Sequence, residues 1–90
     1  MTITELHQVV KTAFPKACWN RYSRGYIATI TDNMSLYVDI PFEGNLPLVE
    51  VVDSEGHVIV FFRDESLEES IKEARLYFKE VIEEINNFLE

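Results

Sequence analysis

The feature that most constrains the fold is a stripe of apolar residues near the C-terminus. Apolar residues recur there in alternating steps of four and three, which places them on one face of a helix. The stripe comprises Leu67, Ile71, Ala74, Phe78, Val81, Ile85 and Phe88. Ser66, with Glu69 three residues later, has the capping-box pattern that begins a helix. The sequence therefore predicts one long amphipathic helix from residue 64 to about residue 89, with an acidic outer face.

A shorter helix is predicted near the N-terminus. Thr2 and Glu5 repeat the capping-box pattern. Four apolar residues then fall on one helix face: Ile3, Leu6, Val10 and Ala13. Pro15 must end this helix, because a proline disfavours helical backbone at the residue before it.

Between the helices, the apolar period changes to that of β-strands, in which alternate residues share a face. Four runs are predicted as two hairpins: 26–31 with 34–40, and 48–52 with 57–62. Residues 17–22 could form a further short strand or an aromatic-rich loop. The fold class is therefore α+β: a four- to five-stranded antiparallel meander sheet, flanked by a short N-terminal helix and a long C-terminal amphipathic helix (α-β-β-β-β-α). We expect a single domain over residues 1–90.

The last two predicted strands are apolar on both faces. One set of side chains can face the core: Val49, Val51, Val58, Val60 and Phe62. A second apolar set then shares the opposite face with Glu50 and His57: Leu48, Val52, Ile59 and Phe61. A sheet face in contact with water normally carries more polar residues than this. We therefore expect either the N-terminal helix or another chain to cover the second face.

The net charge of −8 is unevenly distributed. Residues 1–24 hold four basic residues and one acidic residue, whereas residues 25–62 hold six acidic residues and no Lys or Arg. Such a charge repels nucleic acid and anionic membranes and steers basic partners toward the protein. The leading hypothesis is a non-catalytic inhibitor or modulator that docks an acidic face on a basic, nucleic-acid-acting protein. That face comprises Asp39, Glu43, Glu50, Glu80, Glu83 and Glu84. A charge that serves only solubility explains the same residues.

Two other surfaces are candidates for contacts. A homodimeric structural or chaperone-like module would use the apolar end of the C-terminal helix: Ile82, Ile85, Phe88 and Leu89. A ligand such as a phosphate-bearing molecule would use a cluster of aromatic and basic residues: Trp19, Arg21, Tyr22 and Arg24. Core packing of the Trp and ion pairs of the arginines with the acidic sheet explain the second cluster equally simply.

The sequence offers little support for catalysis. His7 and His57 are the only histidines, and a phosphoester-acting enzyme that uses both is the third hypothesis. Neither a metal-ligand spacing nor a glycine-rich phosphate loop is present, so we expect no metal and no cofactor. Cys18 is the single cysteine, which excludes an internal disulfide and favours the cytoplasm, and its neighbour Trp19 suggests that it is buried.

Overall fold

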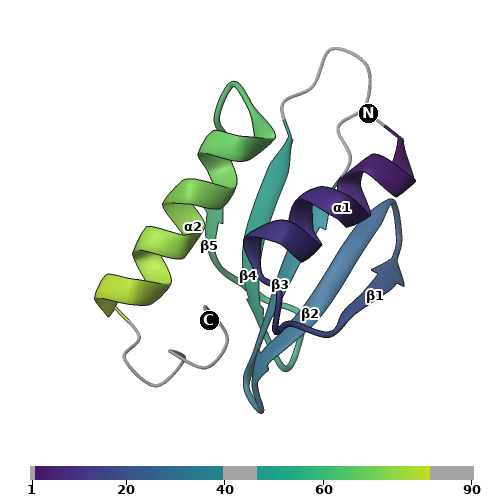
Figure 1. Cartoon of the computed structure of the whole chain (residues 1–90). Coiled ribbons are helices and arrows are strands. Elements are labelled where there is room, and N and C mark those ends of the chain that lie inside the picture. Colours follow the sequence, from purple (N-terminus) through teal and green to yellow (C-terminus); the bar gives the residue numbers. More distant parts are fainter. Residues whose placement is uncertain (1, 40–46, 82–90) are drawn as a thin grey trace.

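The computed structural model describes residues 2–39 and 47–81. Helix α1 comes first, five strands follow, and helix α2 comes last (Figure 1). The elements are α1 (Ile3–Ala13), β1 (Trp19–Tyr22), β2 (Gly25–Thr31), β3 (Met34–Asp39), β4 (Leu48–Asp53), β5 (Val58–Phe62) and α2 (Leu67–Val81). The strands form one antiparallel sheet in the order β1-β2-β3-β4-β5. The predicted α+β meander is confirmed, and residues 19–22 form its first strand.

The beginning and end of α1 follow the sequence prediction. The Thr2 hydroxyl accepts a hydrogen bond from the Glu5 backbone N–H (3.1 Å), and the Glu5 carboxylate accepts one from the Thr2 N–H (3.3 Å). These bonds satisfy backbone donors that have no partner within the helix. The helix ends at Ala13, before Pro15, and buries Leu6 and Val10 against the sheet.

Both helices lie on the same face of the sheet (Figure 1). Their buried side chains form a single core with alternate residues of β2, β3 and β4. The buried sheet residues are Tyr26, Ala28, Leu36, Val38, Val49 and Val51. Helix α1 therefore does not cover the second face, which was one of the two alternatives. We call this second face, opposite to the helices, the open face.

A bulge changes the prediction for β5. Val51 pairs with Val60, but Val52 pairs with Val58, so Ile59 is an extra residue in the ladder. Val60 and Phe62 pack against the core as predicted. Val58 does not, because the bulge places it opposite Val52 on the open face, where it is 49% exposed. The predicted core position of Val58 was wrong for this reason.

Aromatic packing and one arginine join the two helices. Phe14 is fully buried, and its ring lies 6.3 Å from that of Phe78 on α2. The Arg75 guanidinium lies 5.4 Å from the centre of the Phe14 ring and donates a hydrogen bond to the Ala13 carbonyl. Ala13 is the last residue of α1, so no N–H group of the helix donates a hydrogen bond to its carbonyl. A side chain of α2 thus caps the C-terminal end of α1.

The described part of α2 begins as predicted. The Ser66 hydroxyl accepts a hydrogen bond from the Glu69 N–H (3.2 Å), and the buried Ser70 hydroxyl accepts one from the Asp64 N–H (2.9 Å). The predicted continuation of this helix to residue 89 lies outside the described residues. Within the described ranges, neither helix is both long and apolar enough to cross a membrane.

We predict that Arg75→Met lowers the free energy of unfolding by about 1–2 kcal/mol, since it removes a charged hydrogen bond and a cation–π contact. Urea denaturation followed by circular dichroism measures the change. Lys72→Met is the control, because Lys72 is an exposed base on the same helix, and it should change stability by less than about 0.5 kcal/mol. Equal losses in both variants would contradict the role of Arg75.

Candidate functional site

The open face contains a shallow hollow of about 410 Å³. Its walls include Tyr22, Ile27, Ser35, Tyr37, Glu50 and Val52. The strand pairing explains why these residues meet, because directly paired residues point to the same face. One row of paired residues crosses all five strands: Asn20, Ile27, Tyr37, Glu50 and Phe61. From β1 to β5, the row contains an amide, an apolar, an aromatic, an acidic and a second aromatic side chain.

Two carboxylates stand close together on this face. Glu50 pairs with Tyr37, and Asp39 lies two residues further along β3, so the two acids are diagonal neighbours. Burial raises the pKa of Glu50, the Asp39 charge raises it further, and Arg63 partly opposes the rise. The Asp39 Oδ1 atom is buried and has no hydrogen-bond partner within residues 2–39 and 47–81. The pair therefore carries negative charge that the described protein groups only partly compensate.

Tyr37 connects the acids to the turn between β1 and β2. Burial raises the pKa of its hydroxyl; a hydrogen bond with Ser23 lowers it, and the charge and hydrogen bond of Asp39 raise it. Ser23 has a positive φ of 52°, which is uncommon for a residue other than glycine. The Tyr22 ring lies edge-on to that of Tyr37, with 5.6 Å between ring centres. The predicted sites did not include Tyr37, although its alternation with Leu36 and Val38 placed it beside Asp39.

Large apolar side chains are exposed at the β5 end of the open face. Val58, Ile59 and Phe61 are 49%, 47% and 61% exposed. Clusters of exposed apolar side chains commonly mark contact surfaces. The sequence predicted a spare apolar set on this side, and Val52, Ile59 and Phe61 belong to it. The open face therefore combines partly buried carboxylates with an apolar margin.

The structure separates the residues of the predicted acidic face. It brings together Asp39 and Glu50 on the open face. Glu80 is exposed on α2, on the helical side of the sheet. The other predicted contact residues lie outside the described residues: Glu43, Glu83 and Glu84 of the acidic face, and Ile82, Ile85, Phe88 and Leu89 of the apolar end.

The sheet also divides the predicted cluster of aromatic and basic residues. Trp19 packs 6.0 Å from the Phe14 ring on the core side, and the Arg21 guanidinium lies 5.9 Å from the Tyr26 ring centre on the same side. Tyr22 points to the open face, because successive strand residues alternate between faces. Arg24 is exposed in the turn that follows. These four side chains do not converge on one point.

The two histidines have separate surroundings. The His7 ring stacks on Tyr26 at 4.8 Å, whereas His57 Nδ1 in the β4–β5 turn lies 3.4 Å from Asp53 Oδ2 and 3.6 Å from Glu55 Oε2. The His57 backbone N–H donates to Asp53 (2.8 Å) and holds the pKa of that carboxyl below its usual value. No group of His, Cys, Asp or Glu suited to a metal ion occurs in the described part of the chain.

Cys18 departs from the sequence prediction. Its thiol is exposed, although its neighbour Trp19 had suggested burial. Trp19 is itself only half-buried, and Cys18 precedes β1 at the edge of the sheet. Position beside an aromatic residue therefore did not determine its exposure.

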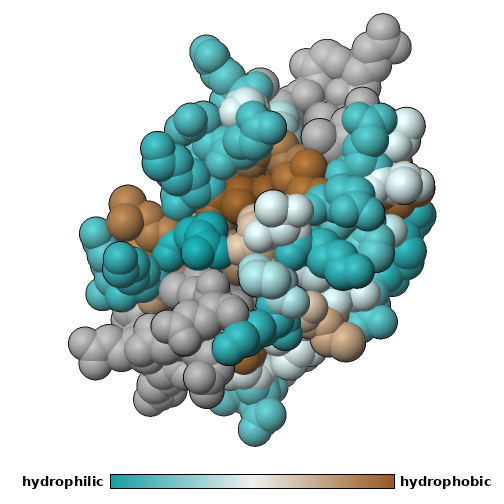
Figure 2. All heavy atoms as spheres, in the orientation of Figure 1, coloured by the Kyte–Doolittle hydropathy of each residue, from teal (hydrophilic) through white to brown (hydrophobic). Residues whose placement is uncertain are grey.

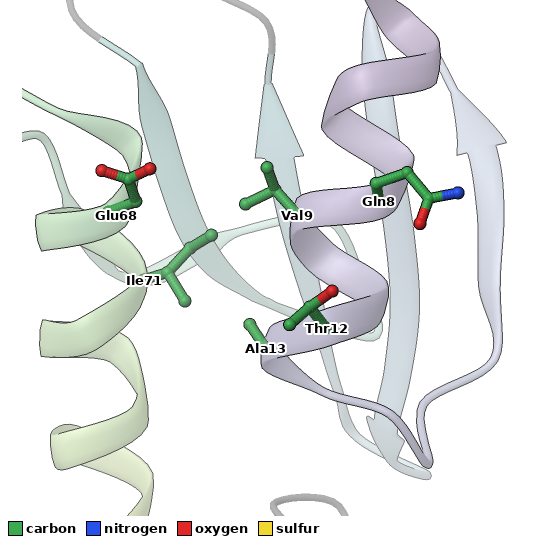
Figure 3. A pocket seen from close by; sticks show the side chains of 6 residues that line it. All are labelled: Gln8, Val9, Thr12, Ala13, Glu68 and Ile71. Carbon is green, nitrogen blue, oxygen red and sulfur yellow. The ribbon is translucent and has the colours of Figure 1, made fainter.

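A second hollow of about 400 Å³ lies between the two helices, where Figure 2 shows apolar surface flanked by hydrophilic side chains. Its lining residues are Gln8, Val9, Thr12, Ala13, Glu68 and Ile71. In Figure 3, Val9 and Ile71 point toward one another across the gap, while the amide of Gln8 points away from it. This groove therefore offers mainly apolar contact, between Val9 and Ala13 of α1 and Ile71 of α2.

Comparison with known proteins found no matching family model, no matching curated protein and no matching solved structure. The open face is therefore the main guide to function.

We predict that Glu50→Gln raises stability at neutral pH. The folded state raises the pKa of Glu50 above its ordinary value of 4.5, so ionisation of this carboxyl opposes folding. Protonated Glu50 makes its full contribution to the free energy of unfolding below pH 4.5. That contribution is lost as the pH rises through the pKa of Glu50 in the folded state. The variant should therefore gain on the order of a few tenths of a kcal/mol at pH 7, because the carboxyl is partly solvated. It should gain nothing at pH 3. Thermal unfolding at both pH values measures this, and a gain at pH 3 alone would contradict the assignment.

Proposed function

We propose that the protein is a small, non-catalytic binding module that docks its open face on a basic surface of another protein. The observation that carries the proposal is the pair Asp39 and Glu50, two diagonally neighbouring carboxylates, because a buried oxygen of Asp39 has no hydrogen-bond partner among the described residues. A cationic side chain from a partner would supply the missing hydrogen bonds and the compensating charge.

The margin of this face suits a protein partner better than a small molecule. Tyr22 and Phe61 are 57% and 61% exposed on opposite sides of the acidic pair. Aromatic side chains are enriched in protein interfaces, and their ring faces attract Lys and Arg. The net charge of −8 would speed the approach of a basic partner and repel nucleic acid itself. A nucleic-acid-acting protein has such a basic surface, and inhibition by occupation of that surface is the simplest outcome. The single exposed thiol of Cys18 is compatible with a cytoplasmic location.

Self-association is the second candidate, supported by the exposure of Val58, Ile59 and Phe61. A dimer through this face would cover apolar surface that the monomer leaves in water. It would also bring two Asp39–Glu50 pairs toward each other, and close like charges oppose association. We therefore favour a basic partner over a second copy.

A defined cationic probe tests the proposal. A short synthetic peptide with the repeat Lys-Lys-Thr-Thr should bind the protein, with an affinity that falls as salt is added. Fluorescence anisotropy with a dye on Cys18 measures the affinity. Glu50→Gln should weaken binding by about three- to tenfold, which is the value of one partly solvated ion pair.

Glu68→Gln is the matched control, because Glu68 is an exposed acid on α2, on the other side of the sheet. It should leave the affinity within about twofold of the unchanged protein. If Glu68→Gln weakens binding as much as Glu50→Gln does, the peptide responds only to net charge and the open face is not the docking surface.

A further inference from the structure

The outer edge of β5 is bare in the described part of the chain, where β5 pairs only with β4. An unpaired edge presents backbone N–H and C=O groups that another strand can join, and proteins usually protect such edges with charged residues or proline. The sequence of β5 is Val-Ile-Val-Phe-Phe, with neither. Among residues 2–39 and 47–81, the one feature that protects this edge is the bulge at Ile59.

The opposite edge of the sheet is protected by contrast. Strand β1 has only four residues, and it carries Arg21 and Asn20, both exposed. Arg24 follows in the turn. The two edges of one sheet thus differ in the features that prevent strand addition. The exposed apolar residues Val58, Ile59 and Phe61 are all on the unprotected edge.

Acidic residues flank the β5 edge on the helical side. Tyr77 contacts Phe62 of β5, with ring centres 5.9 Å apart, so this side of α2 is turned toward β5. Glu73 and Glu80 lie one turn before and after Tyr77 and therefore share its side. Glu73 is also hydrogen-bonded to Asp64, just after β5, which raises the pKa of Glu73.

The basic residues of α2 are on its other side. Arg75 reaches Ala13 of α1, and Lys72 and Lys79 lie one turn before and after Arg75. On the open face, Glu50 lies directly across from Phe61 of β5. Arg63, which follows β5, already acts on Glu50. The edge is thus bordered by acids on both faces of the sheet.

We propose that β5 receives an extended segment of the partner as a sixth strand, and that this segment carries lysine or arginine side chains on both of its faces. This inference rests on the proposed function and specifies how the partner binds. Backbone hydrogen bonds to Val58–Phe62 supply affinity, and the flanking acids select basic side chains. A second copy of the chain fits less well, because it would bring Glu73 and Glu80 of both copies to the same seam.

Backbone methylation of the probe peptide separates strand addition from simple charge attraction. Two peptides with the repeat Lys-Lys-Thr-Thr, which places lysine on both faces of a strand, are compared, one unmodified and one N-methylated at every amide. The methylated peptide keeps its charge but has no backbone N–H donor on either edge, so it cannot form a strand ladder. The inference predicts at least about tenfold weaker binding of the methylated peptide, equivalent to the loss of one or two hydrogen bonds. Amide hydrogen exchange of Val58–Phe62 should slow when the unmodified peptide is bound, while that of Trp19–Tyr22 should not change.

A protein variant gives a second test. Val58→Pro removes a donor from the exposed edge, because the His57 carbonyl faces β4 and the backbone groups of the next residue point away from it. This variant should weaken binding of the unmodified peptide. If Val58→Pro does not fold, the methylated peptide still decides the question, because it requires no change in the protein.

Three results would overturn the inference. Equal binding of both peptides, with dependence on Glu50, contradicts strand addition and leaves the proposed function in place. Absence of binding by either peptide contradicts both proposals. If the free protein has twice the monomer mass and Val58→Pro returns it to a monomer, a second copy occupies the edge.

Discussion

The placement of both helices on one face of the sheet determines the rest of this structure. Phe14, Phe78 and Arg75 hold α1 and α2 together, and the Arg75 guanidinium caps the end of α1 at Ala13. One core then forms between this pair of helices and alternate residues of β2, β3 and β4. The other face of a five-stranded sheet is left for solvent or for a partner. That face is therefore the candidate binding surface.

Much of this fold follows from local chemistry. The capping box at Thr2, the hydroxyl cap at Ser66 and the stop before Pro15 each act within a few residues, so the sequence alone predicted them. The side of the sheet on which α1 lies could not be predicted, because Leu48, Val52 and Phe61 made both faces of the sheet apolar enough to accept a helix. The bulge that turned Val58 outward depends on the pairing of β5 with β4, which residue order does not reveal.

The candidate site was predicted only in part. Asp39 and Glu50 were both named, but they are brought together by the pairing of β3 with β4, which joins the two predicted hairpins and whose register was not predicted. Tyr37 was missed, although its alternation with core residues placed it on the same face. Glu80 does not belong to the open face. It lies on the same side of α2 as Tyr77, which contacts Phe62 of β5, so Glu80 is near the β5 edge. The distribution of charge along the sequence therefore indicated that the surface is acidic. The pairing between strands determined which acidic residues are neighbours.

On the open face, the partial burial of Glu50 raises its pKa and opposes its ionisation, and proteins commonly accept such a cost at binding sites. The most direct test is the pKa of the Glu50 side chain, followed by the chemical shift of its carboxyl carbon in free and peptide-bound protein. We expect the pKa of Glu50 to lie above the ordinary 4.5 in the free protein and to fall when the cationic peptide binds. A free-protein pKa at or below 4.5, or a value that binding does not lower, would contradict it.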